Sequence, residues 1–390
     1  MRETTRHISP LQYAILESTA FIGIGIFEFP RMLVLQAGND AWWGLIADGA
    51  AACLEIWLLL KVAMVDPEET LLGMARRIWP GPGYWAFGLI DNLVHLILPV
   101  IALTQFTYVI VTFFLPDTTP WTIELVMTAM AAYIAWWDLP ALVRTIQVVY
   151  IPVMAVSIGM LILLIPHITN TYAIWPSANL RLYPTMLGAL HTFYIFVGFE
   201  SIPLFWPYVR RQDQPRARHY TYWVLALSCV FYAGILAATL GSENPWYLVH
   251  LEWPGISALR LISVVGLLLD KLGLLVVVFW GILSLFFISI RFWSLTHALL
   301  PMVRQRTITW YRGIMLGFAL TVFAIALLVP NVQVADSWIA RSVPFVLLFI
   351  FVYPVAFLGT AAWRKRHPVR DIPLSGSVHR IDGQSSPGRH

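Results

Sequence analysis

Three observations predict an all-α integral membrane protein with about ten transmembrane helices. Hydrophobic residues make up 59% of the 390 residues and charged residues only 12%, whereas a soluble domain carries about 25% charged residues. The mean hydropathy is +0.72. Apolar runs of roughly 20 residues, enough for one helical span, recur along the chain. These features exclude a soluble enzyme, a nucleic-acid-binding protein and a disordered chain, and the runs are too long for the strands of an outer-membrane barrel.

The predicted spans follow one another through short loops. Five of them contain no charged residue, at 148–165, 220–240, 272–290, 313–329 and 342–363. Five others carry ionisable groups, at 11–35, 42–65, 85–114, 123–137 and 186–208. The fourth span is the least defined, because Glu124 and Asp138 bracket a short run. The external stretch 241–270 contains two prolines and is expected to hold a short interfacial helix.

Arginine placement predicts the orientation, because cytoplasmic loops carry an excess of Lys and Arg. With the N-terminus inside, the inner segments hold most of these residues, at positions 2, 6, 76, 77, 144, 210, 211, 216, 218, 304, 306 and 312 and in the tail. The outer segments hold only Arg181, Arg260, Lys271 and Arg341. We therefore expect a cytoplasmic N-terminus at 1–10, a transmembrane domain at 11–363 and a disordered cytoplasmic tail at 364–390, rich in Ser, Gly, Pro and Arg.

No pattern in the chain predicts catalysis. The two cysteines, Cys53 and Cys229, lie inside apolar runs without the spacing of a disulfide framework or a zinc site. A phosphate-binding G-x-x-x-x-G-K-[ST] loop and a nucleophile–base pairing are both missing from the sequence. We expect no enzyme activity, no cofactor, no metal and no nucleic acid partner.

The first span contains a predicted helix break. Gly23 and Gly25 lack the Cβ atoms that stiffen a helix, and Pro30 removes a backbone donor. Glu28 lies between them and Arg31 follows. One interpretation is an unwound segment whose amides face a small polar ligand. The alternative is close packing of the glycines against a neighbouring helix.

The sixth span repeats this pattern with Gly198, Glu200 and Pro203. An acid at membrane depth costs at least about 2.5 kcal/mol, so Glu200 should face the bundle interior and have a partner or carry a proton. A structural hydrogen bond to a freed helix end is an equally weighted role for it. The first and sixth spans are five apart, which is the spacing of a five-plus-five inverted repeat with discontinuous first and sixth helices.

Several segments of the chain resemble the endospore germination permeases, the GerAB-type B subunits of germinant receptors. The resemblance extends from residue 5 to about residue 360. The more specific segments are A-G-N-D-A-W at 37–42 and T-F-F-L-P-D-T-T-P-W at 112–121. It also includes I-S-P-L-Q at 8–12, G-x-G at 23–25, F-x-P-Y-V at 205–209 and L-R-L-I-S at 259–263.

The resemblance implies membership of the amino acid–polyamine–organocation superfamily and a LeuT-like fold for the permease domain. It implies a B subunit that binds a nutrient germinant, such as an amino acid, near the membrane midplane. The implied partners are a germinant receptor A subunit, a lipoprotein C subunit and membrane lipid. The implied location is the spore inner membrane or the bacterial cell membrane.

By the same resemblance, the two breaks line the ligand pocket with Gly23, Ile24, Gly25, Ile26, Phe196, Val197, Gly198 and Phe199. The acids beside the breaks, Glu28 and Glu200, join this predicted set. Tyr108, Ser284 and Gln105 of the third and eighth spans are weaker candidates. Glu28 departs from the family pattern, in which an aliphatic residue is expected at this position.

Other ionisable residues leave alternatives open. Asp91 and His95 share a helix face and form either a proton relay or, more often at a cytoplasmic end, a solvated hydrogen bond. Asp48 and Glu55 share a helix face, which we expect to point toward neighbouring helices or toward a partner subunit. The competing functions are an autonomous proton-coupled amino acid permease, coupled through Glu28 or Glu200, and a membrane scaffold without a small-molecule ligand.

Overall fold

The computed structural model describes residues 7–21, 24–176, 180–262, 273–302 and 308–366. Gly23, Lys271 and the part of the predicted disordered tail from residue 367 onward lie outside these ranges. Within them the regular structure is helical, and one isolated bridge joins Ile8 to Val209. The all-α prediction is confirmed.

Sixteen α-helices are described. They are α1 (Pro10–Phe21), α2 (Phe29–Ala37), α3 (Ala41–Ala63), α4 (Leu71–Ile78), α5 (Pro82–Phe113), α6 (Pro120–Ala135), α7 (Leu139–Leu164), α8 (Thr171–Ile174), α9 (Leu182–Thr192), α10 (Ile202–Phe205), α11 (Gln214–Ser242), α12 (Pro245–Leu248), α13 (Pro254–Leu259), α14 (Gly273–Leu299), α15 (Ile308–Ala326) and α16 (Val332–Arg366). Short 3₁₀ turns at the two breaks are η2 (Ile24–Phe27), η5 (Phe193–Phe196) and η6 (Phe199–Ser201).

Six described helices are long and apolar enough to cross a membrane: α5, α7, α11, α14, α15 and α16. A seventh span is the pair 182–196 and 199–208, which bends by 48° at its break. The other three predicted spans are different in kind. The first is divided into α1 and α2, α3 carries Asp48, Glu55 and Lys61, and α6 has only 16 residues. The number ten therefore stays a prediction, while the multi-pass architecture is established.

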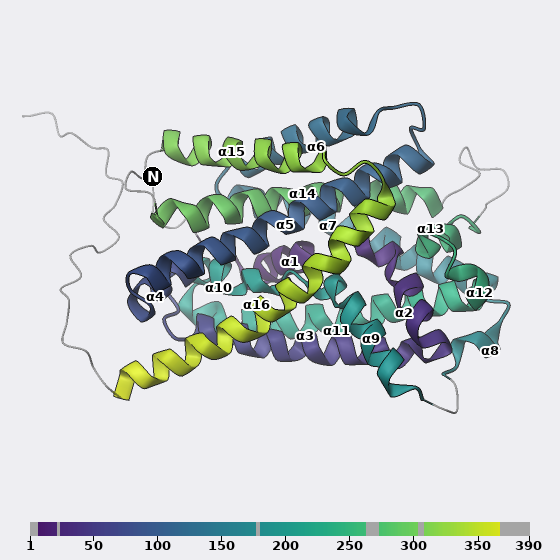
Figure 1. Cartoon of the computed structure of the whole chain (residues 1–390), viewed down its shortest axis with the longest axis horizontal. Helices are drawn as coiled ribbons and strands as arrows, with labels where there is room; N and C mark the ends of the chain where they lie inside the picture. Colours follow the sequence, from purple (N-terminus) through teal and green to yellow (C-terminus); the bar gives the residue numbers. More distant parts are fainter. Residues whose placement is uncertain (1–6, 22–23, 177–179, 263–272, 303–307, 367–390) are drawn as a thin grey trace, which may run out of the picture.

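The first half of the first span occupies the centre of the bundle. α1 packs against α7, α11 and α14, and Figure 1 shows it behind α5 and α16. Every residue from Tyr13 to Ala20 is buried, including Glu17, Ser18 and Thr19. A helix that is buried on all sides and still carries polar residues must satisfy them within the protein, so α1 marks a polar interior.

The described parts of the predicted cytoplasmic loops lie at one end of the bundle (Figure 1). There Arg77 Nη2 lies 2.6 Å from Asp66 Oδ2, and Arg364 Nη1 donates to the Arg77 carbonyl at 2.8 Å. α4 and the C-terminal end of α16 lie at this end, whereas α8, α12 and α13 lie at the other (Figure 1). The short helices α12 and α13 fall in the predicted external stretch. We call the first end the basic end.

Two predicted helix bounds are wrong in ways that matter below. The eighth span was predicted to end at residue 290, but α14 continues to Leu299 and carries Arg291 inside the bundle. The tenth span was predicted to begin at 342, but α16 begins at Val332 and carries Asp336 and Arg341. In both places the predicted bound lies next to a charged residue, Arg291 or Arg341, that is in fact inside the helix.

Candidate functional site

The first span is broken between α1 and α2. After α1 ends at Phe21, the chain forms η2, and the Glu28 amide donates to the Gly25 carbonyl at 3.1 Å. Pro30 lies in the first turn of α2, where its missing N–H removes no helical hydrogen bond. The break thus occurs at the glycine and proline residues that predicted it.

The sixth span is broken at Val197, whose extended backbone (φ −69°, ψ 119°) interrupts the helical turns η5 and η6. The two breaks meet through Tyr194. Its ring lies against Gly25, where an added Cβ would overlap the ring, and its hydroxyl donates to Glu28 Oε2 at 3.2 Å. The glycine is therefore needed for close packing between the two breaks. Both interpretations of Gly25 apply, because it lies in the helix break and also packs closely against a neighbouring segment.

A cavity lies between these breaks. Its empty space is about 680 Å³, part of it open to solvent. Its walls come from η2, α5, η5, α11, α14 and α16. The lining is mainly aliphatic and aromatic, with polar groups from Glu28, Gln105, Tyr194 and Ser342. Gln105 Oε1 is buried and has no hydrogen-bond partner among the described residues.

Charged residues lie beside this cavity, toward the end opposite the basic end. Arg31 Nη1 is 3.5 Å from Asp336 Oδ2 and 3.4 Å from Glu252 Oε2. Gln105 Nε2 donates to Asp336 Oδ1 at 2.8 Å, which links this group to the cavity wall. Burial raises the pKa of Glu252, which lies in the loop between α12 and α13. With Glu28, three acids surround one guanidinium, so this region favours an additional cation.

The predicted site residues divide into three groups. Gly25, Ile26, Glu28, Val197 and the weaker candidate Gln105 line the cavity. Gly23 and the side chain of Ile24 lie outside what the structure describes. The remaining six are not among the lining residues, and they are Phe196, Gly198, Phe199, Glu200, Tyr108 and Ser284.

The residues of the last group have other roles or surroundings. Phe196 packs edge-on against Tyr232, with ring centroids 5.2 Å apart. Tyr108 donates to the Val329 carbonyl at 2.7 Å, and Ser284 is buried. Sequence reasoning did not identify Tyr194, Tyr232 or Asp336, although Tyr194 stands next to the predicted break.

We predict that Gly25→Val impairs the response to ligand while insertion into the membrane is retained. The new side chain would displace the Tyr194 ring, and overpacking of this kind costs about 1–3 kcal/mol. Tyr194 would then lose its hydrogen bond to Glu28. Gly159→Val is the matched control, because an added Cβ there meets nothing within 4 Å. A Gly25→Val protein that binds ligand and unfolds like the Gly159→Val protein would contradict the packing argument.

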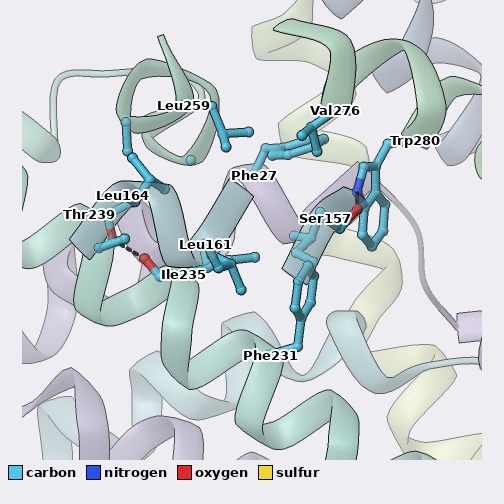
Figure 2. Close-up of a pocket in the computed structure, with 14 residues that line it drawn as sticks. Phe27, Ser157, Leu161, Leu164, Phe231, Ile235, Thr239, Leu259, Val276 and Trp280 are labelled. Carbon is cyan, nitrogen blue, oxygen red and sulfur yellow. Dashed lines mark hydrogen bonds between the residues drawn. The ribbon is translucent and has the colours of Figure 1, made fainter. Parts of the chain in front are cut away.

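A second, apolar pocket of about 350 Å³ lies beside η2. Figure 2 shows Phe27 and Trp280 on its wall with Ser157 and Thr239. Ser157 donates to the Val153 carbonyl and accepts from Trp280 Nε1, and Thr239 donates to the Ile235 carbonyl. Since these side-chain donors are already used, this pocket is poorly equipped to orient a polar ligand.

Glu200 belongs to a separate buried group, which we call the Arg291 cluster. Its members are Tyr13 and Glu17 of α1, Glu55 of α3, Asp91 and His95 of α5, Glu200 of η6, Arg291 of α14 and Tyr353 of α16. Arg291 Nη1 donates to Glu200 Oε1 and, at 3.1 Å, to His95 Nδ1. Its Nη2 donates at 2.8 Å to the carbonyl of Ala20, in the last turn of α1. One guanidinium therefore holds both broken spans.

This cluster settles two earlier alternatives. The predicted partner of Glu200 is Arg291, which was missed because the eighth span was ended too early. The solvated interpretation of Asp91 and His95 is wrong, since the two side chains are only 4% and 2% exposed. Asp48 does face a neighbouring helix, where its Oδ2 accepts from Thr192 Oγ1 at 2.7 Å.

Comparisons with known proteins agree with this architecture. The family described as spore germination protein matches residues 7–334. Spore germination protein GerQB of Bacillus cereus is 19% identical over 92% of this chain and 97% of its own length. Spore germination protein YndE of Bacillus subtilis (strain 168) is 22% identical over 94% and 99%. Spore germination protein B2 of the same strain is 21% identical over 88% and 98%.

Among solved structures, the chain is similar to a Na⁺-coupled sialic acid symporter in a substrate-bound, outward-open state. The TM-score is 0.57, with 11% identity over 88% of this chain and 79% of the symporter. At that identity the likeness concerns the fold, which is LeuT-like. With the broken spans and the matched length taken together, the chain belongs to the spore germination protein family and is a multi-pass membrane protein with a LeuT-like fold.

Proposed function

We propose that this protein is the B subunit of a germinant receptor. It binds a nutrient germinant in the cavity between the two breaks and passes the signal to an A subunit and a lipoprotein C subunit. The proposed location is the spore inner membrane, with both termini in the cytoplasm. The observation that carries the proposal is the 680 Å³ cavity between two interrupted helices, lined by Glu28, Gln105 and Tyr194.

The chemistry of the cavity favours an amino acid or a similar small amine with an apolar side chain. Glu28 offers a carboxylate to an ammonium group, and Gln105 Oε1 offers a free acceptor. The surplus of acid around Arg31 attracts the same positive charge. The aliphatic and aromatic walls suit an apolar side chain, and the interrupted backbone offers amides to a carboxylate.

Signalling follows from differential binding. The cavity is shared by η2 of the first span, η5 of the sixth and α16. A ligand that contacts all three binds best to one arrangement of these elements, and it can shift the population only by that difference in affinity. A partner subunit that contacts the moving elements would then detect the ligand.

The test begins with the purified full-length protein in lipid nanodiscs. A ligand that binds only the folded state at 100 times its Kd should stabilise it by about 2.7 kcal/mol, which is read as a rise in Tm. Single amino acids are screened first. Spores lacking the gene are then exposed to the stabilising compounds, and unchanged germination with every one of them would overturn the receptor proposal.

The autonomous proton-coupled permease is the second candidate function. The observation in its favour is that two ion pairs lie next to the cavity wall. Asp336, paired with Arg31, accepts from Gln105 of the wall, and Arg291, paired with Glu200, lies over the ring of Phe287 of the wall. Such pairs suit a protein that opens and closes the cavity in turn. Uptake of labelled amino acid into proteoliposomes containing this protein alone, driven by a pH gradient, separates the two functions. Accumulation without partner subunits supports transport.

A further inference from the structure

The Arg291 cluster contains more acid than its bases can neutralise. Arg291 and Glu200 form one neutral pair, both 2% exposed or less. His95 is also neutral, because an arginine N–H can only donate and its partner Nδ1 must therefore be the unprotonated nitrogen. Asp91 lies 3.9 Å from the other ring nitrogen of His95. Glu17 and Glu55 then have no positive charge left to pair with among the described members of the cluster.

The hydrogen bonds around Ser201 indicate that Glu17 carries a proton. Ser201 Oγ lies 2.7 Å from the Gly198 carbonyl and 3.4 Å from Glu17 Oε2. A hydroxyl has one proton, and the carbonyl at the shorter distance can only accept it. The contact with Glu17 is then satisfied when the Glu17 carboxyl donates. The Tyr13 hydroxyl lies beside the same carboxyl.

The Glu55 carboxyl has even fewer interactions that could stabilise a negative charge. It is fully buried, and neither of its carboxylate oxygens has a hydrogen-bond partner in the part of the chain that the structure describes. Glu17 and Glu200 lie within electrostatic range and oppose a further negative charge, and Arg291 is already paired. An ionised carboxylate without a partner is too costly in such an interior, so the neutral acid is the stable form.

Part of the Arg291 cluster faces a cavity next to α4, at the basic end. A cavity of about 290 Å³ is lined by Asp91, His95 and Glu200 together with His297 and residues of α4. Its walls are thus three titratable members of the Arg291 cluster on one side and the helix that carries Arg76 and Arg77 on the other. We therefore expect protons to reach the cluster through Asp91, His95 and Glu200 and not through the ligand cavity.

We propose that Glu17 and Glu55 form a proton-binding site that is filled from the basic end. Its protonation state controls the bonds that Arg291 makes to Glu200 of the sixth span and to the Ala20 carbonyl of the first span. With both protons bound, the guanidinium is free to hold Glu200 and the Ala20 carbonyl. Loss of the protons leaves two carboxylates that compete for the same guanidinium. Arg291 is then drawn from Ala20, and the end of α1 loses the donor that satisfies its last carbonyls.

The test uses the full-length protein in nanodiscs without any germinant, so its outcome is independent of the receptor proposal. The variant is Glu17→Gln with Glu55→Gln, which copies the shape and charge of the protonated acids. The control is Glu68→Gln, since the Glu68 side chain is 77% exposed in a loop. Infrared spectra record the C=O band of protonated carboxylic acids, and thermal unfolding is measured between about pH 5 and pH 9.

The double variant should lose the part of the infrared band contributed by two acids, while the Glu68→Gln protein keeps the wild-type band. Because the two acids are protonated in the folded state, wild-type Tm should fall as the pH rises, and the double variant should be flatter. An unchanged band in the double variant would overturn the proposal. So would sodium-dependent stabilisation at high pH that the double variant lacks, because a metal cation would then occupy the site.

Discussion

Arg291→Gln should destabilise the protein by about 3–5 kcal/mol, because it leaves Glu200 as an uncompensated buried charge. It also removes the donor to the Ala20 carbonyl and so loosens α1 at the centre of the bundle. The expected result is a large fall in Tm and a loss of monodisperse protein after extraction. Thermal unfolding of the purified protein, followed by fluorescence and size-exclusion chromatography, measures both.

Two further variants make this result specific. Arg312→Gln removes an exposed arginine that lies over the Trp136 ring, with its Cζ 4.7 Å from the centroid, and should cost much less. Arg291→Gln combined with Glu200→Gln removes both charges of the pair and should recover much of the lost stability. If Arg291→Gln unfolds like Arg312→Gln, the central role of Arg291 is wrong.

Glu28→Gln should weaken the binding of an amine germinant by roughly ten- to a hundredfold, with little change in stability. A hydrogen bond to a charged group contributes about 1.5–3 kcal/mol, and the amide keeps the shape of the side chain while removing its negative charge. The measurement is the ligand concentration that gives half-maximal thermal stabilisation, together with the germination dose response of spores that carry the variant.

Glu124→Gln is the matched control for this prediction. Glu124 is also a buried acid within a helix, 2% exposed on α6, but it is not among the residues that line the cavity. It should leave the dose response unchanged. Equal ligand affinity in the Glu28→Gln and wild-type proteins would show that the ammonium group binds elsewhere, and it would leave Gln105 as the stronger candidate.

Local sequence was enough to locate the two breaks. Gly25, Pro30 and the acid between them disfavour a continuous helix whatever surrounds them, and Gly198, Glu200 and Pro203 do the same in the sixth span. Backbone propensity acts over a few residues, so it can be read from one chain. The same locality explains why four of the five predicted residues that line the cavity belong to the breaks, while Gln105 lies on α5.

Arg291 and Asp336 lie inside helices, although both were predicted to lie outside the membrane spans. Each interrupts an apolar pattern, and a charged residue is normally expected at the end of a span. Here Arg291 is followed by Phe292 and Trp293 and is completely buried. The apolar residues after Arg291 already indicate that the helix continues. The desolvation cost of burying the guanidinium is offset by its bonds to Glu200 of η6 and to the Ala20 carbonyl of α1, which the sequence does not show.

The sequence by itself determined a multi-pass helical membrane protein, its family resemblance and the places where two helices are interrupted, because composition and backbone propensity are local properties. The tertiary structure decided which acids act together. It placed Glu28 at the ligand cavity with Tyr194 and Gln105, and it placed Glu200 in a different group with Glu17, Glu55 and Arg291. The two breaks look alike in sequence, but their acids have different surroundings, since partners far along the chain fix the environment of each charge. Tyr194 lies 166 residues from Glu28, and Arg291 lies 91 residues from Glu200.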